Sequence, residues 1–119
     1  MDFDVAVIGG GSAGYASAST AQALGARVAI IDPGPLGGLC ILRGCMPTKT
    51  ILRSSDIMAL MRRAEEFGLK FDNFEADYSV AVERSRQVVD RNTRGVGFLL
   101  RKNKVDHIQG TGKITGIGK

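Results

Sequence analysis

The fold class of this chain follows from residues 5–14, which read Val5-Ala6-Val7-Ile8-Gly9-Gly10-Gly11-Ser12-Ala13-Gly14. The four leading apolar residues are typical of a strand that is covered on both faces of a parallel sheet. A glycine-rich turn follows, and an alanine-rich helix is predicted from about Ala13 to Leu24, with Gly25 after its end. A second strand is predicted from Arg27 to Ile31. Strand, helix and strand in this order predict a βαβ unit with a right-handed crossover.

The turn has the spacing of a phosphate-binding motif. Gly9, Gly11 and Gly14 match G-x-G-x-x-G between a strand and a helix. The first glycine permits the tight turn, the second lets the backbone approach a pyrophosphate, and the third lets helix and strand pack closely. The helix start, with Ser12 and Ala13, presents free N–H groups and the positive end of its dipole to an anion. The motif favours dinucleotide binding over a turn with a purely structural role, but it does not distinguish FAD from NAD.

An acidic residue lies where a ribose would be recognised. Asp32 follows Gly11 by 21 positions and ends the second predicted strand. A carboxylate at this point can accept hydrogen bonds from ribose hydroxyls, and it would repel a 2′-phosphate.

The rest of the chain is predicted to belong to the same domain, with no second domain within residues 1–119. A loop is expected over residues 33–38, and Pro47 suits the first turn of a long helix that ends before Gly68. A connection and a second helix, from about Tyr78 to Lys102, are expected next. Val105 to Ile108 is predicted to be a strand, and the segment from Gly110 onward to be a turn with a possible further strand.

Composition favours a soluble, cytoplasmic chain. Its 44% hydrophobic and 24% charged residues are ordinary for a globular protein. The start is acidic, at Asp2 and Asp4, whereas a signal peptide needs a basic start. No stretch approaches the roughly 18 apolar residues of a membrane span. The net charge of +4 is interpreted as solvated helix surface, because aromatic residues for base stacking are scarce, so neither a membrane nor nucleic acid is an expected partner.

Two cysteines, Cys40 and Cys45, flank Gly44 just before the predicted long helix. A structural disulfide would close so small a loop that the gain is on the order of 2 kcal/mol. A zinc site needs about four ligands, and the chain adds only His107 to the two thiols, so no metal site is expected. Two inert thiols are the third alternative. The redox interpretation rests on the helix N-terminus, which would stabilise a thiolate at Cys45 and leave Cys40 as the attacking thiol.

Residues 37–49 read G-G-L-C-I-L-R-G-C-M-P-T-K and closely resemble the active-site segment of the pyridine nucleotide-disulfide oxidoreductases, G-G-T-C-x-N-x-G-C-x-P-[ST]-K. That family includes dihydrolipoyl dehydrogenase, mercuric reductase and glutathione reductase. Residues 7–14 match the FAD-binding turn of the family equally well. The resemblance covers essentially the whole chain and implies an α/β fold: the N-terminal part of a Rossmann-like FAD-binding domain with a parallel sheet.

The resemblance also implies a role for each matched residue. Cys45 would lie against the flavin, able to form a charge-transfer complex, and Cys40 would exchange with substrate. Lys49 would sit beside the reactive nitrogen of the flavin. The remaining cofactor-binding residues implied by the resemblance are Gly9, Gly11, Ser12, Ala13, Gly14, Asp32 and Gly38.

The implied activity is that of a flavoprotein oxidoreductase. Electrons would pass from NAD(P)H through FAD to the cysteine pair, and then to a small-molecule disulfide or another acceptor. The full-length enzyme would be a homodimer, and the 119-residue chain is expected to lack turnover by itself.

Three departures from the family pattern point to a less characterised branch. They are Leu39 in place of threonine, Leu42 in place of asparagine, and Arg43 in place of a small apolar residue. His107 is expected to be structural. The alternative function is a non-catalytic dinucleotide-binding module whose cysteines are structural or bind metal.

Overall fold

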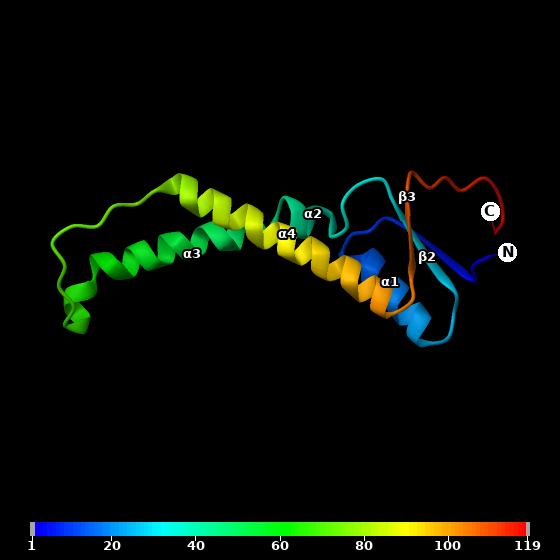
Figure 1. Cartoon of the computed structure of the whole chain (residues 1–119), viewed down its shortest axis with the longest axis horizontal. Helices are drawn as coiled ribbons and strands as arrows, with labels where there is room; N and C mark the ends of the chain where they lie inside the picture. Colours follow the sequence, from blue (N-terminus) through cyan, green and yellow to red (C-terminus); the bar gives the residue numbers. More distant parts are fainter. Residues whose placement is uncertain (1, 119) are drawn as a thin grey trace.

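The chain is built around a small parallel sheet from which a long helical hairpin projects (Figure 1). The computed structural model describes residues 2–118. Its elements are β1 (Val5–Ile8), α1 (Ser12–Ala23), β2 (Val28–Asp32), α2 (Gly38–Leu42), α3 (Cys45–Arg62), the 3₁₀ turn η1 (Ala64–Phe67), α4 (Tyr78–Lys102) and β3 (Asp106–Gln109). The α/β class and the predicted βαβ unit are confirmed.

The three strands are parallel and lie in the order β1-β2-β3. Val5 pairs with Val28 in one ladder, and Ala29 pairs with Asp106 in the other. The connection from β1 to β2 and the connection from β2 to β3 proceed in the same direction across the sheet. Because such connections are right-handed, α1 and α4 lie on the same face of the sheet. The carboxyl ends of β1 and β2 therefore open toward the turn that precedes α1.

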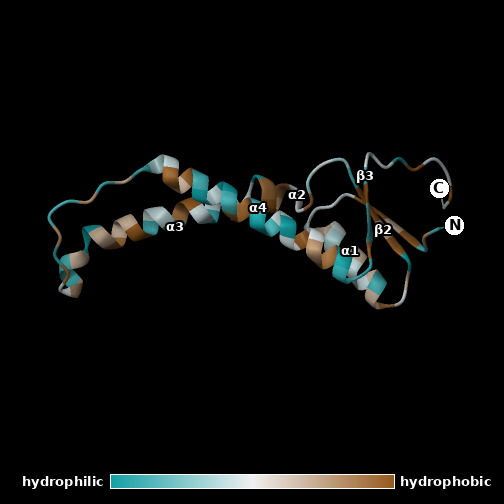
Figure 2. Ribbon diagram, viewed as in Figure 1, coloured by the Kyte–Doolittle hydropathy of each residue, from teal (hydrophilic) through white to brown (hydrophobic). Residues whose placement is uncertain are grey.

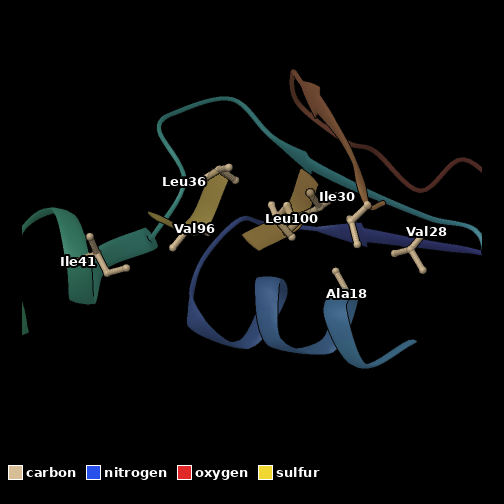
Figure 3. Packing of buried hydrophobic residues seen from close by; sticks show 8 residues of the cluster. Ala18, Val28, Ile30, Leu36, Ile41, Val96 and Leu100 are labelled. Atoms are coloured by element: carbon tan, nitrogen blue, oxygen red, sulfur yellow. The ribbon is translucent and has the colours of Figure 1, made fainter. Parts of the chain in front are cut away.

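The core lies between this face of the sheet and the two helices (Figure 3). Ala18 of α1, Ile30 of β2 and Leu100 of α4 are at most 1% exposed. The small side chain of Ala18 lets α1 approach the sheet closely, while Ile30 and Leu100 fill the space between strands and α4. This packing holds the ends of β1 and β2 in place around the turn.

Helices α3 and α4 pack along each other and extend away from the sheet, giving a molecule about 68 Å long (Figure 1). Apolar and polar residues alternate along both helices, as Figure 2 shows. The Asp77 side chain caps α4 by accepting a hydrogen bond from the Ser79 N–H at 2.8 Å. Arg84 of α4 also donates to the Thr50 carbonyl of α3 at 3.2 Å. The hairpin orients α3, whose first residue is Cys45.

Most predicted elements agree with the structure, and two differ. The bounds of α4 match the prediction, and the helix continues through Gly95 and Gly97. The segment that leads into the long helix contains α2, an additional short helix. No strand follows Gly110 within the described residues. No helix in this described part is long and apolar enough to span a membrane.

Three hydrogen bonds join the residue before β1 to the residue before β2. Arg27 donates to the Asp4 carboxylate from Nε at 3.1 Å and from Nη2 at 2.8 Å, and its backbone N–H donates at 2.9 Å. These bonds lower the pKa of Asp4 from 3.8 to about 2. Because the folded-state pKa is the lower one, the ionised carboxylate stabilises the fold fully above about pH 4, and most of this contribution is lost as the pH falls from there to about 2.

Asp4→Asn is therefore expected to lower the free energy of unfolding at neutral pH and to have a much smaller effect near pH 2. Urea unfolding at the two pH values measures the difference. Asp56→Asn is the control, because Asp56 forms no ion pair within residues 2–118. An equal loss at both pH values would contradict the assignment of this pair.

Candidate functional site

The turn between β1 and α1 has no room for side chains where helix and strand meet. A Cβ at Gly14 would lie 1.8 Å from the carbonyl oxygen of Gly9. Gly9 itself has a φ of +106°, a conformation that favours glycine. The structure thus shows the close packing at Gly14 that the motif predicts, and it brings the start of α1 directly above the end of β1.

The N-terminus of α1 carries unsatisfied backbone donors. Gly11 occupies the N-cap position and has no side chain to cap the helix. The first-turn N–H groups, at Ser12, Ala13 and Gly14, have no partner within the helix. Together with the helix dipole they form a site suited to an anion such as a pyrophosphate.

Asp32 is held by backbone groups on both sides. Its Oδ2 accepts a hydrogen bond from the Gly10 N–H at 2.6 Å, and its Oδ1 accepts one from the Gly34 N–H at 2.8 Å. The carboxylate thus ties the end of β2 to the turn. Each oxygen keeps one lone pair with which to accept a further donor. The role of Asp32 toward a ribose stays a prediction.

A second loop presses against the phosphate-binding turn. The Gly37 N–H donates to the Gly10 carbonyl at 2.9 Å. A Cβ at Gly38 would lie 2.6 Å from the Cα of Gly11, so the two backbones touch. Sequence reasoning missed the parts played by Gly10 and Gly37. The only trace of them in the sequence was the run of glycines at each loop.

The two cysteines lie on neighbouring helices. Cys40 belongs to α2 and is half-buried, whereas Cys45 is the first residue of α3 and is exposed. Hydrogen bonding to the Cys45 side chain, together with desolvation, raises the pKa of Cys40. The Cys45 N–H and the charge of Lys49 act on that pKa in the opposite direction. The separate roles of the two thiols stay a prediction.

One cleft joins the phosphate-binding turn to the cysteine pair. Its volume is about 540 Å³, and its lining comprises Ile8, Gly9, Gly11, Ser12, Ala13, Gly14, Leu39, Cys40, Gly44 and Cys45. The structure thus brings both predicted catalytic thiols together with five of the predicted cofactor-binding residues. Gly38 lies beside this cleft against Gly11, while Asp32 and Lys49 do not line it.

The lining includes two apolar residues outside the predicted set of catalytic and cofactor-binding residues. Ile8 and Leu39 are 51% and 76% exposed. Large apolar side chains left this open beside a cleft are well suited to cover a flat apolar ligand ring. The cleft therefore combines the backbone donors of α1 with apolar surface and two thiols.

Comparisons with known proteins identify relatives of the whole described region. The family model described as pyridine nucleotide-disulphide oxidoreductase matches residues 3–119. A dihydrolipoyl dehydrogenase of Zymomonas mobilis is 44% identical over 96% of this chain, and one of Chlorobaculum tepidum is 41% identical over 96%. A dihydrolipoyl dehydrogenase of Bacillus subtilis is 36% identical over 97%. The chain spans 24% of the length of each of these relatives.

Proposed function

The chain belongs to the pyridine nucleotide-disulphide oxidoreductase family, and from this premise we propose that it forms the flavin- and thiol-bearing part of an FAD-dependent oxidoreductase. The proposed activity passes electrons from NAD(P)H through FAD to Cys40 and Cys45, and on to a small-molecule disulfide or a related acceptor. The observation that carries this proposal is the single cleft that joins the uncapped N-terminus of α1 to both thiols. The full-length homodimer and the cytoplasmic location are further proposals.

The residues of the cleft fit FAD. The N–H groups at the start of α1 would bind the pyrophosphate, and the absence of side chains at Gly9 and Gly11 leaves the backbone open to it. Ile8 and Leu39 would cover the flavin ring beside the thiols. Asp32 would use its remaining lone pairs to accept hydrogen bonds from ribose hydroxyls. FAD, when bound, supplies the chemistry that exchanges a hydride with NAD(P)H and an electron pair with a disulfide.

The cysteine pair would carry the electron pair to the acceptor. Reduction of a disulfide between Cys40 and Cys45 takes two electrons and two protons and yields two thiols. Deprotonated Cys40 would attack a substrate disulfide, which forms a mixed disulfide and releases one substrate thiol. Cys45 would then attack the sulfur of Cys40, restoring the internal disulfide and releasing the second substrate thiol. The contact between the two thiols supports this second step.

Two features favour redox chemistry over the alternative of structural or metal-binding cysteines. No group of three or more histidine, cysteine, aspartate or glutamate side chains within residues 2–118 could hold a metal ion. Both thiols also open onto the cleft, whereas a structural bridge has no need of such access.

The proposal predicts a yellow protein with a redox-active cysteine pair. The full-length polypeptide should retain FAD through gel filtration, and reduction by two electrons should add a long-wavelength absorbance band. Thiol titration should find two more thiols after reduction than before. A colourless protein that retains NAD, with a thiol count unchanged by reduction, would support the non-catalytic module instead.

A further inference from the structure

The loop at Gly37 and Gly38 contacts the phosphate-binding turn at Gly10 and Gly11. This contact connects the turn to the segment that carries the cysteines. The hydrogen bond from the Gly37 N–H to the Gly10 carbonyl is 2.9 Å long. Beside it, the backbone of Gly38 lies so close to Gly11 that an added Cβ would be 2.6 Å from the Gly11 Cα. Gly11 is the N-cap of α1, so the contact is made at the phosphate-binding end of the cleft.

Gly38 is also the first residue of α2, the helix that carries Cys40 two positions later. This helix is anchored by Ile41, which is 8% exposed and belongs to the hydrophobic core (Figure 3). Gly37 packs against the same side chain, because a Cβ there would lie 2.8 Å from the Cβ of Ile41. The start of α2 is thus confined between the core and the phosphate-binding turn, and a displacement at Gly11 must move α2.

We propose that Gly38 is a positioning residue that couples occupancy of the phosphate-binding turn to the thiol–disulfide equilibrium of Cys40 and Cys45. The inference rests on the proposed function, because it assumes that the turn binds a pyrophosphate and that the thiols are oxidised reversibly. Coupling between two sites is reciprocal, so oxidation of the thiols must change the affinity for the pyrophosphate by the same factor.

ADP tests this coupling, because it carries the pyrophosphate but no flavin ring that could contact the thiols. The measurement is the equilibrium constant between the cysteine pair and a glutathione buffer, in the flavin-free full-length protein, with and without saturating ADP. We expect ADP to change this constant by about fivefold or more, the lower end of ordinary coupling between sites. Unchanged equilibrium in the presence of bound ADP would overturn the inference.

Gly38→Ala tests the route of the coupling. The added methyl group must push α2 away from Gly11, so the variant should lose the effect of ADP on the thiols and bind ADP more weakly. Gly68→Ala is the matched control, because Gly68 also has a positive φ, +73°, but has no atom within 4 Å of an added Cβ. Coupling that persists in Gly38→Ala would overturn the inference.

Failure of the proposed function and failure of the coupling give different results. If ADP and FAD do not bind at all, the proposed function is wrong and the inference falls with it. If both bind and the thiols are oxidised reversibly, but ADP leaves their equilibrium unchanged, only the inference is wrong. Should Gly38→Ala fail to fold, the ADP measurement on the unmodified protein still decides the question.

Discussion

Replacing Gly14 by alanine is expected to destabilise the protein by about 3 kcal/mol or more and to abolish FAD binding, because overpacking at a rigid contact forces backbone shifts. The added Cβ would lie 1.8 Å from the Gly9 carbonyl oxygen, and neither backbone has a flexible side chain that can yield. Helix α1 would have to move off β1, which displaces the N–H groups that the proposal assigns to the pyrophosphate. Urea unfolding and the flavin content of the purified full-length protein measure the two effects.

Gly95→Ala is the matched control for this prediction. Gly95 also lies within a helix, α4, but an added Cβ there meets no atom within 4 Å. Alanine should therefore raise the free energy of unfolding by roughly 0.5–1 kcal/mol through helix propensity and leave flavin binding unchanged. A Gly14→Ala protein that binds FAD as tightly as the Gly95→Ala protein would refute the account of the turn.

Serine substitution of either cysteine is expected to reduce NAD(P)H-dependent disulfide reduction by more than about a thousandfold, the scale seen when an essential nucleophile is removed. Both variants should keep their FAD, because a hydroxyl replaces a thiol of similar size at the end of the cleft. The two should differ in their spectra. Cys40→Ser leaves in place the Cys45 thiol, which the proposal puts beside the flavin, and should keep the long-wavelength band, whereas Cys45→Ser should lose it.

Steady-state assays and visible spectra of the full-length variants check this prediction. Ser17→Ala is a suitable control, because Ser17 is exposed on α1, lies outside the cleft lining and bonds only to the Gly14 carbonyl. Wild-type turnover in either cysteine variant would remove the basis for a dithiol mechanism. An identical loss of the band in both variants would contradict the separate roles of the two sulfurs.

The elements that sequence reasoning predicted well are those with strong local patterns. Helix α4 has apolar residues near helical spacing, so its approximate bounds, Tyr78 to Lys102, were predictable from the sequence. The glycines at Gly95 and Gly97 left its last turns open, and the cap at Asp77 was seen only in the structure. The βαβ unit was predictable because an apolar run, a glycine turn and an alanine-rich helix follow each other directly. Helix α2 was not predicted, because its five residues are too few to show either a helical apolar spacing or a recognisable cap.

The site divides in the same way between local and long-range information. The amino-acid sequence alone determined the components of the candidate site: the uncapped, glycine-rich helix start and the two cysteines close to the start of α3 are properties of neighbouring residues. Only the tertiary structure decided how these parts meet, through the Gly10–Asp32 and Gly10–Gly37 hydrogen bonds and the Gly11–Gly38 contact. Those contacts join residues more than 20 positions apart, so they form only once β2 pairs with β1 and the core closes over α1 and α4.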